Sequence, residues 1–231
     1  MTDAVAPVAP MARWKDLCVD AVDPASLGAF WAAVTGLDLA VGGDHVTLDG
    51  PTDAHRVWVN AVDRPHTVKN RLHLDVDAAS VDDVVALGAR VLSRAEDTGF
   101  GWHVLADPEG NELCVFVREP ADVPAYRLHG VVIDSVDAVA LATWWGGVLG
   151  AEPVLQAELG WATLEGVAVD DRMTLDFVPV PEPRTVPNRV HWDLWGDVDA
   201  VVAAGATRLW EGRSWTVLAD PEGNEFCVFA P

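Results

Sequence analysis

An internal repeat restricts the folds that this chain can adopt. Residues 104–116, Val-Leu-Ala-Asp-Pro-Glu-Gly-Asn-Glu-Leu-Cys-Val-Phe, return at 217–229 with a single change, Phe226 in place of Leu113. Residues 70–75, Asn-Arg-Leu-His-Leu-Asp, return at 188–193 as Asn-Arg-Val-His-Trp-Asp. Two repeated segments in the same order indicate two homologous halves. With 231 residues in total, each half is long enough to bury a core of its own.

The segment between the repeats predicts the domain boundaries. Residues 118–126 read Arg-Glu-Pro-Ala-Asp-Val-Pro-Ala-Tyr, the Pro-containing polar composition of a linker. We therefore expect a flexible arm at 1–12, a first domain at 13–118, a linker at 119–126 and a second domain at 127–231.

Each half contains the pattern of an amphipathic helix among short strands. Asp23 precedes Pro24 as an N-cap, apolar side chains follow at helical spacing, and Gly36 ends the pattern; Asp137 to Gly150 repeats it. A shorter helix is expected at 80–87. Strand-like runs in the first half lie at 14–21, 37–41, 45–48, 56–60, 71–76, 90–92, 102–105 and 112–117. The order of strand, helix and three strands, given twice in each half, predicts an α+β fold of four βαβββ modules.

Charge and cysteine content limit the classes of partner and the cellular location that we expect. The chain carries 36 acidic and 15 basic residues, a net charge of −21, which disfavours nucleic acid and anionic membranes and leaves small molecules. No run approaches the ~18 apolar residues that a membrane span needs. Cys18, Cys114 and Cys227 are an odd number without zinc-site spacing, and the N-terminus has no signal-peptide pattern, so we expect a cytoplasmic protein.

Taken together, these motifs resemble a known superfamily. Val22-Asp23-Pro24 through Gly36-Leu37, the Asn-Arg-x-His-x-Asp strands and the Asp-Pro-Glu-Gly-Asn-Glu hairpins occur in the order found in the vicinal oxygen chelate proteins. That superfamily comprises glyoxalases, bleomycin-resistance proteins and extradiol dioxygenases, and the chain is most similar to its glyoxalase-like branch. The resemblance implies two tandem glyoxalase-like domains whose paired modules form open, cup-shaped sheets, holding a ligand and often a divalent metal.

Strand alternation predicts which side chains face each cup. If Leu72, Leu74 and Val76 pack under a helix, Arg71, His73 and Asp75 point to the opposite side. The same parity applies to Arg189, His191 and Asp193 in the second half. We expect three strands of the first half to bring polar groups into one concavity, and the second half to do the same. The expected groups are Asp16, Arg71, His73 and Glu112 in the first half, with Trp14 on the same side as Asp16, and Asp134, Arg189, His191, Asp193 and Glu225 in the second.

The positions at which the superfamily usually binds metal are altered here. The resemblance places Asp16 or Gly130, Arg71 or Arg189, and Cys114 or Cys227 at those positions, so no metal cofactor is expected. If a divalent transition metal is bound, the ligands would be His73, Glu112, His191 and Glu225. Each of these has a plainer interpretation: a neutral histidine bonded to a neighbouring carboxylate, or a glutamate accepting from backbone N–H groups.

Three functional hypotheses remain open, and the sequence does not decide whether the protein is an enzyme. The first, which the 11 tryptophans and the altered metal positions favour, is a bleomycin-resistance-like protein that binds an apolar or aromatic small molecule in a Trp-walled cup without metal. Its ligand contacts would be Asp16, Arg71, His73, Trp102, Arg189, His191 and Trp215. The second is a metal-dependent lyase, isomerase or dioxygenase acting on vicinal oxygens, with Glu112 or Glu225 moving a proton. The third is a pseudo-dimer, monomeric or homodimeric, whose second half is a scaffold.

Overall fold

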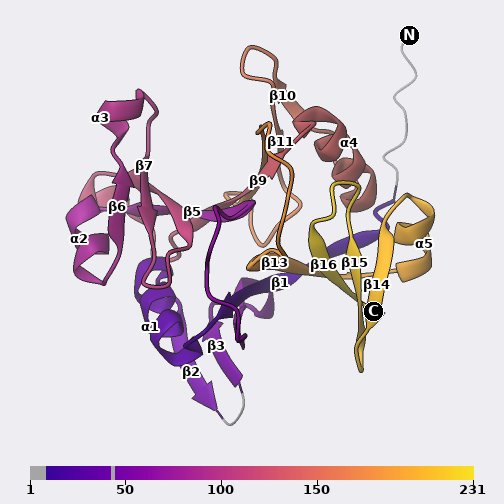
Figure 1. The fold of residues 1–231 in the computed structure, drawn as a ribbon, viewed down its shortest axis with the longest axis horizontal. Helices are drawn as coiled ribbons and strands as arrows, with labels where there is room; N and C mark the ends of the chain where they lie inside the picture. The colour runs from indigo at the N-terminus through magenta and orange to yellow at the C-terminus, as the bar shows by residue number, and fades with distance from the viewer. Residues whose placement is uncertain (1–8, 43–44) are drawn as a thin grey trace.

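The computed structural model describes residues 9–42 and 45–231, and it contains the four predicted modules (Figure 1). Module 1 comprises β1 (Ala12–Ala21), α1 (Pro24–Thr35), β2 (Asp38–Gly42), β3 (His45–Asp49) and β4 (Val57–Ala61), with a 3-10 turn η1 (Asp53–His55). Module 2 comprises β5 (Leu72–Ala78), α2 (Val81–Ala86), β6 (Arg90–Ser93), α3 (Ala95–Thr98), β7 (His103–Ala106) and β8 (Glu112–Val117).

The second half repeats this order after a 3-10 turn, η2 (Pro120–Asp122). Module 3 comprises β9 (Leu128–Ser135), α4 (Ala138–Leu149), β10 (Val154–Gln156), β11 (Trp161–Leu164) and β12 (Thr174–Pro179). Module 4 comprises β13 (Val190–Gly196), α5 (Val198–Ala203), β14 (Thr207–Glu211), β15 (Trp215–Ala219) and β16 (Glu225–Phe229). The α+β fold class is therefore confirmed, and among the described elements the four-residue α3 and the two 3-10 turns, η1 and η2, were not expected.

Each sheet combines a module from one half with a module from the other. Sheet A has the order β14-β15-β16-β13-β1-β4-β3-β2 and joins modules 1 and 4; sheet B has the order β10-β11-β12-β9-β5-β8-β7-β6 and joins modules 2 and 3. The seams are the antiparallel pairs β1 with β13 and β5 with β9 (Figure 1). The expectation that Asp16 would share a concavity with Arg71, His73 and Glu112 is therefore wrong, because β1 belongs to sheet A and β5 and β8 to sheet B. The expectation that Asp134 would join the polar groups of the second half is wrong for the same reason, because β9 belongs to sheet B and β13 and β16 to sheet A. The domain division at 119–126 stays a prediction about the sequence duplication.

The long helices form for the reasons that the sequence indicates. The Asp23 carboxylate accepts from Ser26 N–H at 3.1 Å, and Gly36 ends α1 in the left-handed region at φ 79°. Asp137 caps α4 in the same way, and Gly150 ends it at φ 77°. The apolar faces of both helices are buried in one core with the inner faces of the strands.

The duplicated hairpins connect the two modules of each half. Asp107 accepts from the N–H groups of Glu109 and Asn111, both at 2.9 Å, and from the indole of Trp31 on α1 at 3.1 Å. Asp220 binds the equivalent groups, including the indole of Trp145 on α4 at 3.2 Å. Thus hairpins and helices join modules within a half, whereas sheet pairing joins modules between halves.

The start of the chain departs from the expected flexible arm. Residues 1–8 of the predicted 1–12 arm lie outside the described residues. Met11 N–H donates to the carbonyl of Val148 at 2.8 Å, Asp197 N–H donates to Met11 O at 3.2 Å, and Ala12 begins β1. The end of this segment is therefore fixed against the second half.

Strand parity places the side chains on the predicted faces, with one correction. Leu72, Leu74 and Val76 are at most 1 % exposed and belong to the core. Trp14, expected beside Asp16, instead packs in the core and donates from Nε1 to Ala54 O at 3.0 Å. The reason is a β-bulge between Trp14 and Asp16, which shifts the register against β13.

Candidate functional site

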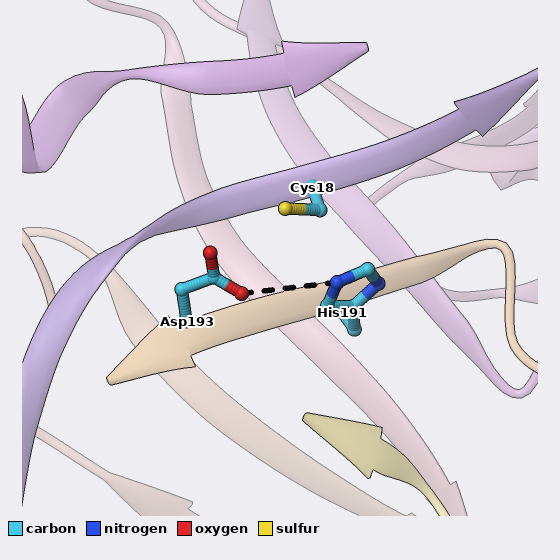
Figure 2. A group of neighbouring side chains, drawn as sticks. All are labelled: Cys18, His191 and Asp193. Carbon is cyan, nitrogen blue, oxygen red and sulfur yellow. Dashed lines mark ion pairs between the residues drawn. The ribbon is translucent and has the colours of Figure 1, made fainter. Parts of the chain in front are cut away.

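The face of sheet A opposite the core, called cup A here, carries a compact polar group. Cys18 on β1 lies opposite His191 on β13, and Asp193 follows two residues along the same strand (Figure 2). His191 Nε2 is 3.8 Å from Asp193 Oδ1. Burial lowers the pKa of His191 to about 4, so the imidazole is neutral at pH 7. Burial and the charge of Asp16 raise the pKa of Asp193 to about 7, against the opposing effect of Lys15.

Lys15 occupies the middle of cup A. Because it is the bulge residue of β1, its side chain turns to the same face as Asp16 and is only 13 % exposed. Its Nζ is 2.5 Å from Asp16 Oδ2, 3.7 Å from Asp193 Oδ2 and 4.3 Å from the centre of the Phe229 ring. An ammonium held by two carboxylates over an aromatic face is a satisfied buried cation.

The corresponding face of sheet B, cup B, is hollow. A cavity of about 280 Å³ lies over β5, β8, β9 and β12, and Trp102, Gln156 on β10 and Trp161 on β11 also line it. Its walls are aromatic: Trp102 stacks on Phe100 at 4.7 Å between ring centres, and lies 5.6 Å from Phe116 and 6.0 Å from Trp161. Trp102, Phe116 and Trp161 are half-buried and line the cavity, whereas Phe100 is exposed and supports Trp102 from outside it.

The floor of cup B is acidic. Asp75 and Asp176 line it from opposite sides of Gly130, where an added Cβ would lie 3.3 Å from the Cβ of Asp75 and 3.5 Å from Oδ2 of Asp176. Asp176 accepts from the hydroxyls of Thr163 at 2.7 Å and Thr174 at 2.6 Å. Burial raises the pKa of Asp176, and these hydroxyl bonds oppose the rise.

Histidines complete the floor. His73 Nδ1 is 3.2 Å from Asp75 Oδ1, and His129 packs edge-on against Phe116 with ring centres 4.8 Å apart. Two buried atoms in this floor, Asp75 Oδ1 and His129 Nε2, have no hydrogen-bond partner within the described part of the chain. Such atoms are costly unless a ligand or solvent satisfies them.

The donor atoms in the two cups do not make a good resident metal site. In cup A the donor atoms of Cys18, His191 and Asp193 lie within 4.8 Å of one another, but Lys15 already supplies the positive charge. In cup B the equivalent group is His73, Asp75 and Cys114. Burial and the charge of Asp75 raise the pKa of the Cys114 thiol, so a metal binding there would first have to displace the thiol proton.

Both predicted catalytic glutamates serve as structural acceptors. Glu112 Oε2 accepts from the backbone N–H of Asn70 at 3.0 Å and lies 3.5 Å from His66 Nε2. Glu225 accepts from the N–H of Asn188 at 3.2 Å and is ion-paired with Arg184. As predicted, each lies on a strand that pairs with the strand of its histidine: Glu112 on β8 beside β5, and Glu225 on β16 beside β13. Neither glutamate lines the cup B cavity.

The repeated arginines also lie away from the cup B cavity. Arg189 is 7 % exposed, and its guanidinium donates to Asn111 Oδ1, Arg64 O, Asp20 O and Glu109 at 2.5–2.9 Å. Its donors thus join the loops around β13 to the first half. Arg71 lies 4.0 Å from Asp134 Oδ2 and lines a separate cavity of about 420 Å³ between the loops at 68–71 and 180–188.

The remaining predicted residues divide between the cups. His73 and Trp102 line the cup B cavity. Asp16 and His191 lie in cup A, where Asp16 also accepts from the indole of Trp58 at 3.0 Å. Trp215 stacks on Phe229 in cup A with ring centres 5.9 Å apart.

Comparison with known families accounts for this duplicated architecture. The model of the glyoxalase-like domain matches the chain twice, at residues 16–116 and 130–229. The chain belongs to the glyoxalase-like domain family. Its predicted membership of the vicinal oxygen chelate superfamily is confirmed by this match together with the fold of its structural neighbours.

Solved structures that share the fold of this glyoxalase-like protein are distant in sequence. Glyoxalase I from Zea mays is 13 % identical, with a TM-score of 0.63, and the match covers 95 % of this chain and 92 % of the other. A mutant of the same enzyme is 13 % identical, with a TM-score of 0.67, and the match covers 95 % of this chain and 92 % of the other. A putative dioxygenase from Bacillus subtilis is 15 % identical, with a TM-score of 0.61 and coverage of 96 % and 86 %. No curated protein matches in sequence.

Several residues of the two cups in this glyoxalase-like protein were not predicted as site residues. They are Lys15 in cup A and His129, Trp161 and Asp176 in cup B. Lys15 and His129 turn into the cups at β-bulges, which sequence periodicity does not reveal. Trp161 and Asp176 reach cup B because module 3 pairs with module 2, a pairing between halves that the repeat itself does not indicate. No helix in the described part of the chain combines the length and the apolar character needed to cross a membrane.

Proposed function

We propose that this glyoxalase-like protein binds a small molecule with a flat aromatic part in cup B. The observation that carries the proposal is the cavity of about 280 Å³ whose wall contains Trp102, Trp161 and Phe116. Small-molecule sites are typically concave and largely apolar, with a few polar groups that fix orientation. Cup B has this composition.

The wall is suited to stacking. Trp102 and Phe100 are nearly parallel, with an interplanar angle of 13°, so each ring restrains the other. A flat ligand can lie against Trp102 while its polar end reaches His73 and Asp75 on the floor. Because the rings are held before binding, little side-chain entropy is lost when the ligand enters.

Binding without a resident metal is part of the proposal. Its support is the donor chemistry of cup B, where the third donor near His73 and Asp75 is the protonated Cys114 thiol. The proposal is restricted to binding because Glu112 and Glu225, the predicted proton carriers, are engaged by backbone N–H groups outside the cavity.

Paired tryptophan variants test the proposal. Trp102 and Trp215 occupy equivalent positions before the duplicated hairpins, but only Trp102 lines the cup B cavity. In fluorescence titrations with a panel of planar aromatic compounds, Trp102→Ala should weaken binding about tenfold or more, since stacking and burial of one ring exceed ~1.4 kcal/mol. Trp215→Ala should bind as the wild type does. Equal affinities in all three proteins, or an effect of Trp215→Ala alone, would contradict the proposal.

A metal titration tests the second half of the proposal. Protein treated with a chelator and dialysed should bind the same compounds with unchanged affinity when Zn²⁺, Mn²⁺, Ni²⁺ or Fe²⁺ is added back. A metal requirement that is lost in His73→Ala would instead favour the metal-dependent alternative.

A further inference from the structure

The two cups are built from equivalent strands of the repeat, so residues of cup A have equivalent residues in cup B. The repeated strands and hairpins match the residues of β13 and β16 to those of β5 and β8. The matched pairs are His191 with His73, Asp193 with Asp75, Cys227 with Cys114 and Phe229 with Phe116. The bulge residues match as well: Lys15 is the extra residue of β1 opposite β13, and His129 is the extra residue of β9 opposite β5.

Cup A shows which chemical group this plan accommodates. The Lys15 ammonium lies over Phe229 at 4.3 Å and between Asp16 and Asp193, with Trp195 at 5.5 Å. It is a primary ammonium on a flexible apolar stem, held by two carboxylates and aromatic faces. The chain thus fills cup A with its own cation.

Cup B has no lysine at the corresponding place, although the Arg118 guanidinium, which is ion-paired with Asp77, lies 5.5 Å from the centre of the Phe116 ring. Its bulge residue, His129, is shorter and leans toward Asp77, with Nε2 3.5 Å from Oδ1. Of the other acidic groups nearby, Asp134 is ion-paired with Lys69, and Asp77 is paired with Arg118 and Arg172. Within the described residues, neither Asp75 nor Asp176 is paired with a lysine or an arginine. Asp75 is nevertheless only 7 % exposed. Its Oδ1 lies 3.2 Å from His73 Nδ1 and, like Asp193 Oδ1 in cup A, has no hydrogen-bond partner within the described residues.

We propose that the ligand of cup B is an organic cation, whose charged nitrogen takes the place over Phe116 and beside Asp75 that corresponds to the place of Lys15 Nζ in cup A. The inference rests on the binding function proposed above and specifies its ligand class as an ammonium group attached to a flat apolar body. The cation neutralises a buried carboxylate and gains cation–π contact with Phe116, while the apolar body stacks on Trp102.

Three probes with the same ring test the charge preference. They are 1-naphthylmethylamine, 1-naphthylmethanol and 1-naphthoate, titrated into the full chain by calorimetry at pH 7. The amine should bind at least tenfold more tightly than the alcohol, and the carboxylate should bind weakest. Asp75→Asn should remove most of the preference for the amine and leave alcohol binding within about twofold. Equal binding of the amine and the alcohol would overturn the cation proposal but leave the binding function standing, whereas no binding of any probe or planar compound would overturn both.

Exchanging the bulge residues tests the correspondence between the cups. Lys15→Ala should remove the ammonium and its stem from cup A and add a second site for the amine, so that the stoichiometry rises from one to two. His129→Lys should fill cup B with an ammonium and weaken amine binding at least tenfold, while His129→Gln, the matched control, stays within about threefold of the wild type. If Lys15→Ala does not fold, as judged by circular dichroism, the His129 pair still decides. Unchanged amine binding in His129→Lys would overturn the inference.

Discussion

Cup A and cup B begin from nearly the same residues and differ in what fills them. Both contain the His-x-Asp strand, the cysteine and the phenylalanine of the repeat. In cup A, the Lys15 ammonium lies 2.5 Å from Asp16 Oδ2 and 3.7 Å from Asp193 Oδ2. In cup B, the bulge carries His129 and an open cavity remains. The bulge residue, Lys15 or His129, and the residue after it, Asp16 or Gly130, thus separate a cup closed by its own side chain from a cup with an open cavity. Duplication made both cups available, and the difference lies in residues outside the conserved part of the repeat.

The largest expected effect concerns the repeated arginines. Arg189→Met should lower the free energy of unfolding by about 3–5 kcal/mol, because it removes the buried cation that binds Glu109 and leaves Asn111 and two loop carbonyls without their donor. Arg71→Met, the equivalent change, should cost less than about 1 kcal/mol, since Arg71 reaches only Asp134 at 4.0 Å. Urea denaturation of both variants measures the difference. Equal losses would show that the two halves use this arginine alike.

The next effect is a pH dependence that belongs to cup A. The unfolded chain loses the Asp193 proton near pH 3.8, whereas the folded protein holds it to about pH 7. The contribution of Asp193 to stability is therefore fully present below pH 3.8 and is lost as the pH rises to about 7. Asp193→Asn avoids that loss and leaves Asp16 to bind Lys15.

We expect Asp193→Asn to be more stable than the wild type at pH 8 by about 1–3 kcal/mol, and to gain nothing at pH 4. Thermal unfolding between pH 4 and pH 8 provides the measurement. Asp16, Cys18, His191 and Cys227 also face this site, so His191→Gln is a suitable control: it retains the Asp193 effect. A constant difference between Asp193→Asn and the wild type over this pH range would contradict the assigned cause.

Much of the fold could be predicted because its determinants are local. Capping aspartates, terminal glycines and strand alternation are short-range patterns, and the strands of the first half, the only ones given predicted bounds, begin and end within a few residues of them. The pairing of modules was not predictable in this way. The contacts of β1 with β13 and of β5 with β9 join segments more than 50 residues apart, and either pairing of modules would bury the same apolar faces.

The candidate site was predictable only for residues whose direction follows from the alternation of side chains along a regular strand. His73, Asp75 and Trp102 line the cavity as alternation and repeat position suggest. Glu112 and Glu225 share the correct strands, but the free backbone N–H groups of Asn70 and Asn188 engage them. A carboxylate accepts from whichever donor the neighbouring loop presents, and the alternation of side chains along a strand does not predict the geometry of that loop. Lys15 and His129 depend in turn on bulges, which change parity at a single residue.

The smallest expected effect separates the two phenylalanines of the repeat. Phe116 and Phe229 end the same motif, but Phe229 lies beneath the Lys15 ammonium, whereas Phe116 faces the open cavity. Leucine keeps an apolar side chain and removes the aromatic face. Phe229→Leu should therefore lower the free energy of unfolding by about 0.5–1 kcal/mol beyond the effect of lost volume, and leave ligand binding unchanged. Phe116→Leu should weaken binding of 1-naphthylmethylamine about two- to fivefold while changing binding of 1-naphthylmethanol less.

The double-mutant cycle of Phe229→Leu with Lys15→Met isolates the cation–π contribution, because the volume effect of Phe229→Leu is common to both backgrounds. A coupling energy near zero would mean that Lys15 is held by its two carboxylates alone. Cup A would then give no support to the expected role of Phe116 in recognising a cation.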